Sequence, residues 1–472
     1  MRGVYPVREI RAAEAAAMAT APDGALMQRA AAALATMCAE LLEHVYGARV
    51  VLLVGAGNNG GDALFAGARL ARRGARVSAL LLERSRAHES GVSALVGAGG
   101  RILDADPALL AGVDLVVDGI VGIGGRPGLR GRAAELAAGV QDALTVAVDV
   151  PSGVDADTGE AGESAVQADV TVTFGALKPG LLVGAGAELA GEVRFVDIGL
   201  DLPAATAFVL EAGDVRATLP QPGPADDKYT RGVVGVVAGS HTYPGAGVLA
   251  TGSAIGGGAG MVRYAGSAAE AIRARYPEVV VQEGARPADL RVQAWTVGPG
   301  MGTDEDAAEL LAEVLAADVP VIVDADALTV LARRPELVRA RAAATVLTPH
   351  DREFARIAGE VGTDRLAAAR RAAADLRAVV LLKGNTTVVA DPDGLAYLNP
   401  TGTPWLATAG SGDVLSGLIG SLLAAGVAAP LAAAAGAYLH GVAGQFAAAD
   451  GPPAAPDVLA QLRSAWRAVE RG

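Results

Sequence analysis

Short apolar segments alternate with helix-like segments along the whole chain, and this alternation limits the possible fold more than any other feature. The clearest apolar runs lie at 50–54, 114–122, 145–153, 232–240, 319–328 and 378–390. Each run ends in glycine or polar residues. Short buried strands separated by helices are typical of parallel sheets that helices cover on both faces. The chain is therefore predicted to be an α/β protein.

A proline-rich segment divides the alternating pattern into two halves. Residues 217–227 contain three prolines and few side chains that could pack in a core, which is typical of a linker. We expect an N-terminal domain at 1–216 and a C-terminal domain at 228–472, each a three-layer α/β/α structure. No fixed-period repeat is present, which argues against a solenoid.

Composition argues against several classes of function. A net charge of −13 and an aromatic content of 4% disfavour a nucleic-acid partner. Cys38 is the only cysteine, so an intrachain disulfide is excluded and a reducing cytosol fits. The uncharged stretch 414–449 is long enough to suggest a membrane helix. Because Pro430 interrupts it, we expect two buried helices, no membrane partner and a cytoplasmic location.

The segment Gly410-Ser411-Gly412-Asp413 precedes a helix-compatible run at 414–423 and indicates phosphate chemistry. Backbone N–H groups and the helix dipole attract an anion to such a helix start. A carboxylate beside a bound phosphate repels it, unless the carboxylate is needed to take a proton from the group that attacks phosphorus. We therefore predict that Asp413 is a general base. The alternative is an Asp that only caps the helix.

Other polar loops in the second half follow strands and are expected to converge on this motif, because functional residues gather at the carboxyl ends of parallel strands. The loop 298–302 can wrap a phosphate. Asp324 and Asp326 can serve water or magnesium, although either could cap a helix, and Asp326 is interpreted as a cap. His350 is either structural or functional. The loop 383–387 is either a simple hairpin or a nucleotide-phosphate loop.

In the first half, residues 55–62 formally match a G-x-G-x-x-G pattern, with Glu83 where a ribose-binding acid could lie. Asn58, Asn59 and Asp62 add side-chain oxygens that a dinucleotide loop does not need. These oxygens indicate recognition of an amide or of a hard cation. The alternative is that they satisfy only the backbone of their own turn.

Two further strand ends of the first half carry Asp118 and the pair Asp149 and Ser152. Each of these side chains could serve only to fix the loop in which it lies. The ends of these strands should, however, lie close to the 55–62 loop, and together they would form a site. The glycine-rich stretch 122–128 can approach a phosphorylated ligand closely, and Arg126 could pair with its charge.

The motifs NNGGD, VDGIVG and VDVPSG, with the upstream MQRAA helix, resemble those of the NAD(P)H-hydrate epimerases. The resemblance implies a Rossmann-like domain with potassium bound by Asn59, Asp118 and Ser152, and with Asp149 in substrate binding and catalysis. Ala63 and the GIGG stretch depart from the family pattern. The implied substrate-binding residues are Asn58, Asn59, Gly60, Gly61, Asp62, Gly122, Ile123, Gly124, Gly125, Arg126, Pro127, Gly128 and Asp149.

The second half resembles the ADP/ATP-dependent NAD(P)H-hydrate dehydratases, which are similar in fold to the ribokinase group. The matching motifs, in order, are KYTRGVVGVVAGS, YPGAG, GPGMG, DADAL, TPHDREF, KGNTT and ATAGSGDVLSG. The resemblance implies that Gly300, His350 and Asp413 contact the hydrated substrate, and that ADP, used with Mg²⁺, is the phosphate donor. TAGSGD replaces the commoner TGGTGD of the family. The implied nucleotide-binding residues are Lys383, Gly384, Asn385, Thr386, Thr387 and Gly412.

Together the two resemblances imply repair of hydrated NADH and NADPH. The first domain would interconvert the R and S epimers, and the second would dehydrate the S form while ADP becomes AMP and phosphate. We also expect a homo-oligomer, of a size that the sequence does not give. The alternatives are a ribokinase-type small-molecule kinase, a non-catalytic N-terminal binding module and an NAD-dependent dehydrogenase.

Overall fold

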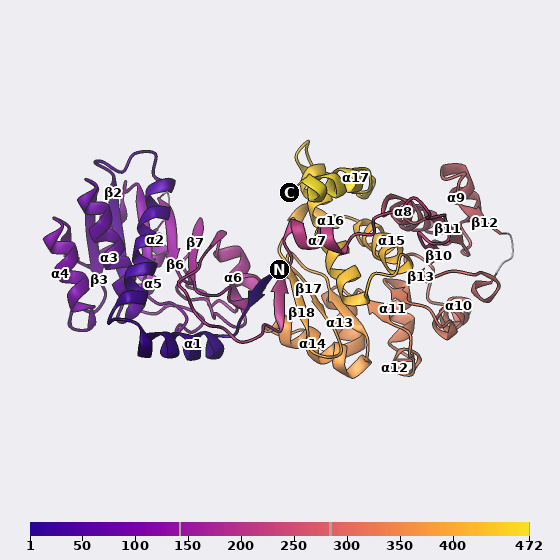
Figure 1. Cartoon of the computed structure of the whole chain (residues 1–472), viewed down its shortest axis with the longest axis horizontal. Helices are drawn as coiled ribbons and strands as arrows, with labels where there is room; N and C mark the ends of the chain where they lie inside the picture. The colour runs from indigo at the N-terminus through magenta and orange to yellow at the C-terminus, as the bar shows by residue number, and fades with distance from the viewer. Residues whose placement is uncertain (141–142, 283–285, 472) are drawn as a thin grey trace. The chain divides into compact units, whose positions relative to one another are not determined.

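The computed structural model describes residues 1–140, 143–282 and 286–471, and it contains two compact units (Figure 1). One unit is Gly3–Ala205, and the other is Thr206–Gly472 together with Met1–Arg2. The division lies earlier than the expected boundary near 217. Strand β9 (Ala207–Val209) pairs with a strand of the C-terminal sheet, and helix α7 (Ala212–Thr218) packs on helices of the same unit. The exposed segment 221–231, which overlaps the predicted linker, therefore lies inside the second unit.

The N-terminal unit is built on a parallel sheet with the order β4-β3-β2-β5-β6-β7-β8. Residues Val50 of β2 and Leu115 of β5 lie opposite each other in the register. The strands predicted at 50–54, 114–122 and 145–153 are confirmed as β2, β5 and β6. The bounds of the strands in this sheet are β2 (Arg49–Val54), β3 (Arg76–Leu81), β4 (Arg101–Asp104), β5 (Leu115–Gly119), β6 (Leu144–Val148), β7 (Val170–Phe174) and β8 (Glu192–Val196).

Alternate side chains of β2 enter two different cores, one on each face of the sheet. Val50, Leu52 and Val54 pack with α2 and α3, whereas Val51 and Leu53 pack with α5. Because both faces are buried, the strand is apolar throughout rather than alternating. The helices of this unit are α1 (Val7–Thr20), α2 (Ala25–Leu41), α3 (Asn58–Arg72), α4 (Glu89–Gly97), α5 (Arg132–Gly139) and α6 (Gly184–Leu189).

The C-terminal sheet has the order β1-β9-β18-β17-β16-β15-β14-β13-β10-β11-β12 over the part of the chain that the structure describes. Strands β10 to β16 are parallel, as predicted, but β17 runs antiparallel to both of its neighbours, β16 and β18. The loop between β16 and β17 is too short for a parallel crossover, which explains this departure from the expectation. The remaining bounds are β1 (Arg2–Val4), β10 (Val233–Val237), β11 (Met261–Tyr264), β12 (Val280–Val281), β13 (Ala294–Val297), β14 (Val321–Val323), β15 (Thr345–Leu347), β16 (Val379–Leu382), β17 (Thr387–Ala390) and β18 (Ala396–Asn399).

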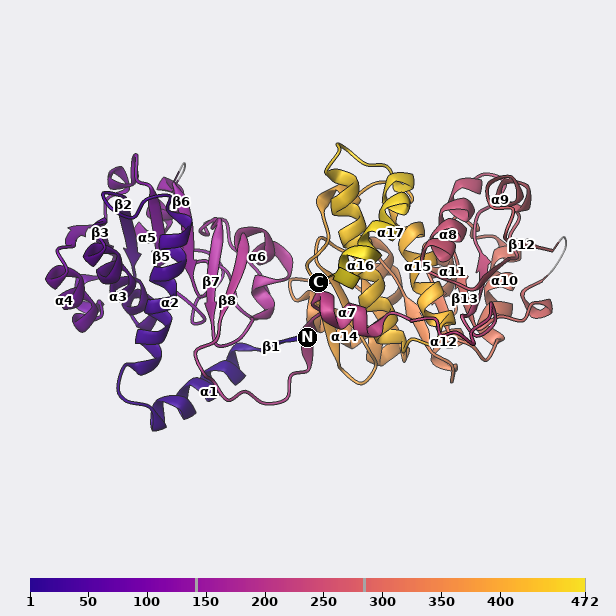
Figure 2. The same cartoon turned by 45° about the horizontal axis from the view of Figure 1, so that its top comes forward.

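Helices α8, α15, α16 and α17 pack together over one face of this sheet, and Figures 1 and 2 show the three C-terminal ones in yellow. The uncharged stretch 414–449 is divided between α15 and α16, as predicted. Within the described ranges, no helix is both long enough and apolar enough to cross a membrane. The helices of this unit are α7, α8 (Pro244–Gly256), α9 (Ala269–Arg275), α10 (Glu305–Ala316), α11 (Asp326–Leu331), α12 (Glu336–Arg339), α13 (Asp351–Ala358), α14 (Arg365–Leu376), α15 (Ser411–Ala424), α16 (Ala429–Ala448) and α17 (Ala455–Arg471).

Among the parallel strands, the strand order reverses between β2 and β5 in one sheet and between β10 and β13 in the other. Open α/β sheets form their ligand crevices at such positions. After β2, a Cβ atom at Gly55 would overlap the carbonyl group of Ile120, so glycine permits these two loops to meet. After β10, the backbone N–H of Gly239 donates to the carbonyl oxygen of Pro299 at 2.6 Å. The predicted motif loops therefore meet at the reversal points.

Candidate active sites

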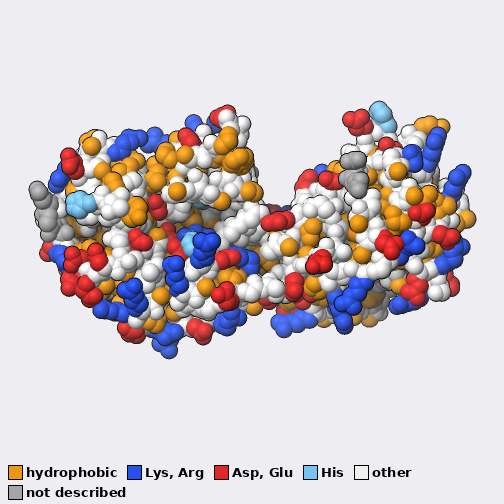
Figure 3. Space-filling model, turned by 180° about the vertical axis from the view of Figure 1, so that it is seen from behind, with side chains coloured by type: hydrophobic (Ala, Val, Ile, Leu, Met, Phe, Trp, Pro, Cys, Tyr) orange, Lys and Arg blue, Asp and Glu red, His pale blue; other side chains and the backbone are white. Residues whose placement is uncertain are grey.

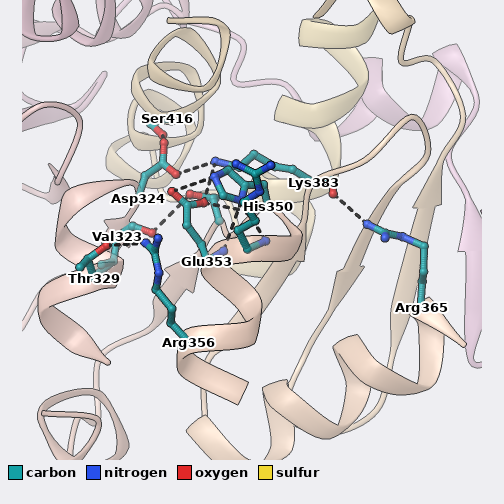
Figure 4. Close-up of polar contacts among 11 residues, drawn as sticks. Val323, Asp324, Thr329, His350, Glu353, Arg356, Arg365, Lys383 and Ser416 are labelled. Atoms are coloured by element: carbon teal, nitrogen blue, oxygen red, sulfur yellow. Dashed lines mark hydrogen bonds and ion pairs between the residues drawn. The ribbon is translucent and has the colours of Figure 1, made fainter. Parts of the chain in front are cut away.

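An ion pair between Lys383 and Asp324 lies at the carboxyl ends of β14 and β16 (Figure 4). Lys383 Nζ donates to Asp324 Oδ1 at 2.8 Å, and Ser416 Oγ donates to Asp324 Oδ2 at 2.6 Å. Glu353 Oε2 lies 3.6 Å from the same Lys383 Nζ. Burial by itself would lower the pKa of Lys383, but Asp324 and Glu353 raise it above its ordinary value. The site therefore holds a charged lysine between two carboxylates.

The turn after β14 directs its two carboxylates to different partners. Ala325, between them, has a φ of 51°, a region that residues other than glycine rarely occupy. Asp324 binds Lys383, whereas Asp326 Oδ2 accepts a hydrogen bond from the Gly302 backbone N–H at 3.0 Å. The interpretation of Asp326 as a helix cap is wrong, because Ala325 occupies the N-cap position of α11. Asp326 instead holds the glycine loop 298–302.

Asp413 lies in the first turn of α15, whose N-cap is Gly410 in the left-handed conformation. The alternative, that Asp413 only caps this helix, is therefore wrong, because Gly410 occupies the N-cap position. Burial, together with the nearby charge of Asp324, raises the pKa of Asp413 to about 7, although Lys383 opposes the shift. A Cβ atom at Gly412 would lie 3.5 Å from Lys383 Nζ. The structure thus brings the glycine motif of α15 to the Lys383–Asp324 pair.

His350 has the structural contacts of a helix cap. Its Nδ1 atom accepts hydrogen bonds from the backbone N–H groups of Arg352 and Glu353 at 3.1 and 3.2 Å. Glu353 Oε2 accepts in return from the His350 backbone N–H at 2.9 Å, which completes a capping box. The imidazole is still 51% exposed. The capping role therefore leaves part of the ring open to a ligand.

The loop 383–387 forms the turn of the β16–β17 hairpin. Gly384 and Asn385 are exposed, while Thr386 is buried. Arg365 Nη2 donates to the carbonyl oxygen of Lys383 at 2.8 Å and so holds the start of the loop (Figure 4). The loop is thus a hairpin turn whose lysine faces the polar site, and its contact with a nucleotide phosphate stays a prediction.

Sequence reasoning missed three side chains of this site. Ser416 lies three residues after Asp413 on one helix, a spacing that places neighbours on the same face and could have indicated it. Glu353 lies three residues after His350 on the same helix turn and was not identified as part of the site. His440 comes from the distant helix α16, and its Nε2 atom lies 3.2 Å from Ser411 Oγ. Burial lowers the pKa of His440 to about 4, so this imidazole is neutral; no sequence signal indicated the pair.

In the N-terminal unit, Asp118 and Ser152 form a buried hydrogen-bonded pair. Asp118 Oδ1 accepts from Ser152 Oγ at 2.7 Å, and Asp118 Oδ2 accepts from the Ser152 backbone N–H at 2.8 Å. Burial raises the pKa of Asp118 to about 6, although hydrogen bonds from Ser152 and Ile120 oppose the shift. A Cβ atom at Gly122 would lie 2.8 Å from Asn59 Oδ1, so that amide lies beside the neighbouring loop. Carboxylate, hydroxyl and amide oxygens are a donor set that suits a hard cation.

Asp149 lies at the edge of a pocket of about 840 Å³ and has a φ of 69°. Its Oδ1 atom accepts from Lys178 Nζ, from the Phe174 backbone N–H at 3.2 Å and from Thr173 Oγ1 at 3.3 Å. Arg126 is exposed and does not line the pocket, whereas Arg11 of α1 does, with its Nη2 atom 3.4 Å from the carbonyl oxygen of Ile123. The predicted residues that line the pocket are Asn58, Asn59, Asp62, Gly122, Ile123, Gly124 and Asp149.

Two further carboxyl groups line the same pocket. Burial, and then the charges of Asp149 and Glu14, raise the pKa of Asp62 well above its ordinary range. Burial and Asp149 likewise raise the pKa of Glu14, although Lys178 opposes the shift. The sequence analysis missed Glu14 and Arg11, because nothing in helix α1 indicated a site. Lys178 follows strand β7, so the strand-end rule could have found it.

Two family models match the chain. Residues 23–180 match the family described as YjeF-related protein N-terminus, and residues 234–462 match the family described as NAD(P)H-hydrate dehydratase. The chain is 53% identical over 409 residues to a bifunctional NAD(P)H-hydrate repair enzyme of Mycobacterium tuberculosis, with 85% of each chain covered. It is 38% identical over 483 residues to the enzyme of the same name from Corynebacterium glutamicum, with 84% of this chain and 83% of that one covered.

Solved structures resemble the C-terminal unit. The ADP/ATP-dependent NAD(P)H-hydrate dehydratase of Bacillus subtilis, co-crystallised with ATP and Mg²⁺, matches with a TM-score of 0.51 and 32% identity, over 55% of this chain and 98% of that one. A ribokinase-like superfamily protein of Enterococcus faecalis matches with a TM-score of 0.52 and 25% identity, over 57% of this chain and 99% of that one. The ribokinase-like fold of this unit is thereby confirmed.

Proposed function

Because the chain belongs to the family of bifunctional NAD(P)H-hydrate repair enzymes, we propose that its two units catalyse consecutive steps of one repair. The N-terminal unit interconverts the R and S epimers of hydrated NADH and NADPH. The C-terminal unit dehydrates the S epimer back to the reduced cofactor, while ADP is converted to AMP and phosphate. The observation that carries the proposal is that each unit holds its own group of carboxylates at the carboxyl ends of its parallel strands.

For dehydration, the hydroxyl group must become a good leaving group. Asp413 takes the hydroxyl proton, the oxygen attacks the terminal phosphorus of ADP, and AMP leaves. Loss of phosphate from one carbon and of a proton from its neighbour then restores the ring double bond. In this proposal, Lys383 and the backbone N–H of Gly412, in the first turn of α15, stabilise charge on the phosphoryl group. Gly300 and His350 contact the hydrated substrate in this proposal.

The remaining predicted roles are also part of the proposal. Lys383, Gly384, Asn385, Thr386, Thr387 and Gly412 bind the nucleotide, for which we favour ADP over ATP. Across the described residues, no three His, Cys, Asp or Glu side chains are grouped to hold a metal ion. The expected Mg²⁺ would therefore depend on the phosphate oxygens of the nucleotide for much of its coordination.

In the N-terminal unit, Asp149 transfers protons at the carbon that changes configuration. Asn59, Asp118 and Ser152 would hold potassium, which would supply positive charge that fixes the surrounding loops. The other substrate-binding residues are those predicted at 58–62 and 122–128. A homo-oligomer stays a prediction, and a cytosolic location is supported by the single, buried thiol of Cys38. Basic and acidic side chains are interspersed over the face drawn in Figure 3, which offers no support for a nucleic-acid partner.

Incubation of the purified protein with a mixture of hydrated NADH epimers, with and without ADP, tests the proposed function. We expect recovery of NADH absorbance only with ADP, with one AMP and one phosphate formed for each NADH. Both epimers should be consumed. A phosphorylated product without NADH would instead indicate the small-molecule kinase, and hydride transfer to an added substrate without ADP would indicate a dehydrogenase. An unconsumed R epimer would indicate a non-catalytic N-terminal module.

The dehydration rate should fall as the pH drops through about 7. Asp413 must be ionised to accept a proton, and burial raises its pKa to about 7, so the active fraction increases above that value and decreases below it. Initial rates between pH 5.5 and 8.5, at saturating ADP and S epimer, measure this dependence. A rate that is flat down to pH 5.5 would contradict Asp413 as the base.

A further inference from the structure

A buried lysine contacts the carboxyl group that we propose as the proton-transfer group of epimerisation. Lys178 Nζ donates to Asp149 Oδ1, to Thr173 Oγ1 at 2.8 Å and to the carbonyl oxygen of Phe174 at 2.9 Å. The side chain of Lys178 is only 1% exposed. Burial of a charged amine is costly unless the charge is paired and its protons are bonded. Two contacts of this amine, Thr173 and Phe174, lie at the carboxyl end of β7, and the third, Asp149, directly follows β6 and lines the pocket.

The two oxygens of Asp149 have different surroundings. Oδ1 accepts from Lys178, Thr173 and Phe174, so its hydrogen-bonding capacity is occupied. Oδ2 faces the glycine loop that lines the pocket, because a Cβ atom at Gly122 would lie 3.4 Å from it. The left-handed backbone of Asp149 is a costly conformation that the surrounding contacts must maintain. One oxygen is thus held in place, and the other is available to a ligand.

The charges around Asp149 are mostly negative. Asp62 on α3 and Glu14 on α1 line the same pocket and interact electrostatically with Asp149. Arg11 interacts with Glu14 and lies at the glycine loop. Lys178 is the cation that directly contacts the Asp149 carboxylate. Lys178 therefore offsets part of the negative charge that the three carboxyl groups bring to this pocket.

We propose that Lys178 is a positioning residue for epimerisation: it holds Asp149 by Oδ1, so that Oδ2 faces the pocket and can exchange a proton with the substrate. This inference rests on the proposed role of Asp149. The inference assigns Lys178 to epimerisation only, whereas Lys383 belongs to the proposed dehydration site. Lys178 makes no contact with the substrate in this role and acts through Asp149.

The variant Lys178→Met removes the charge and keeps most of the apolar stem. We expect the kcat for conversion of the R epimer to fall about 100-fold, because small displacements of a catalytic group cost that much. KM should change by less than about threefold, since the interaction lost is one that matters mainly in the transition state. The acid limb of the pH–rate profile should move to higher pH. Lys228→Met, an exposed lysine in the other unit, is the matched control and should leave both activities unchanged.

Chemical rescue shows whether epimerisation needs the positive charge of Lys178 or only the volume that its side chain fills. In Lys178→Ala, a primary alkylammonium ion of three or four carbons should restore part of the epimerase rate, while the alcohol of the same length should not. Wild-type kcat and pH profile in Lys178→Met, combined with loss of activity in Asp149→Asn, would overturn the inference but leave the proposed function intact. Wild-type epimerase activity in Asp149→Asn would overturn the proposed role of Asp149 and the inference with it.

A milder variant decides the question if Lys178→Met does not fold. Thr173→Val removes the hydroxyl that bonds both Lys178 Nζ and Asp149 Oδ1 and conserves the shape of a buried side chain. We expect a smaller loss of kcat, about tenfold, with the pH profile displaced in the same direction. An unchanged kcat and an unchanged profile in Thr173→Val would overturn the inference.

Discussion

Asp413→Asn should abolish ADP-dependent dehydration and leave epimerisation at the wild-type rate. The amide has nearly the same shape as the carboxylate, but it cannot accept the hydroxyl proton of the substrate. General-base catalysis contributes about 10²- to 10⁴-fold, so the residual rate should lie at or below the detection limit of a coupled assay. The measurement is recovery of NADH absorbance from the S epimer with ADP present, alongside the R-to-S ratio from chromatography.

Stability distinguishes loss of the base from loss of the fold. The pKa of Asp413 is raised on folding, so the folded state binds this proton more tightly than the unfolded state does. Ionisation of this carboxyl group therefore lowers the stability of the protein as pH rises from 3.8 to about 7, and the loss is complete above 7. Asp413→Asn should consequently unfold at the same or a higher temperature than the wild type at pH 8. Asp393→Asn, an exposed carboxylate of the same unit, is the control and should dehydrate normally. Dehydration at the normal rate in Asp413→Asn would show that another group is the base.

Much of the fold could be predicted because each buried strand is a continuous apolar run. Val50 to Val54 face two cores, and a segment of this kind is recognisable without knowing its partners. The domain boundary was placed too late, since β9 has only 3 residues and follows a loop, so its pattern is too short to identify. The residues of β17 form the same kind of apolar run as the parallel strands do. Its antiparallel pairing follows from the short loop between β16 and β17, which cannot form a parallel crossover.

Site residues were predictable where one short motif carries the reactive side chain. They were not predictable where the side chain comes from a separate helix or loop. Lys383 directly follows strand β16, and Gly412 lies in the first turn of helix α15. Both positions are at the same edge of the sheet, which is why the two motifs could be expected to form one site. Asp326 was interpreted as a cap because a helix follows it; its actual partner, the Gly302 backbone, depends on how two loops meet. Glu14 belongs to a helix whose pattern gives no sign of a pocket. Long-range packing decided these contacts.

Asp149→Asn should slow consumption of the R epimer by at least about 100-fold, while the S epimer is repaired at the normal rate. The amide can no longer exchange a proton through Oδ2, and its contact with Lys178 loses the negative charge. With a mixture of the two epimers, repair should slow sharply when the S form is exhausted, because slow spontaneous epimerisation then limits the rate. The measurement is the time course of both epimers by chromatography at saturating ADP.

The time course also tests whether the two units hold separate sites. Asp201→Asn, an exposed carboxylate of the N-terminal unit, is the matched control and should consume both epimers as the wild type does. Adding Asp413→Asn protein to Asp149→Asn protein should restore full consumption of the mixture, because each variant retains the activity that the other lacks. Equal loss of both epimers in Asp149→Asn would count against separate sites. Failure of the mixed variants to complement each other would require that substrate stay within one chain between the two steps.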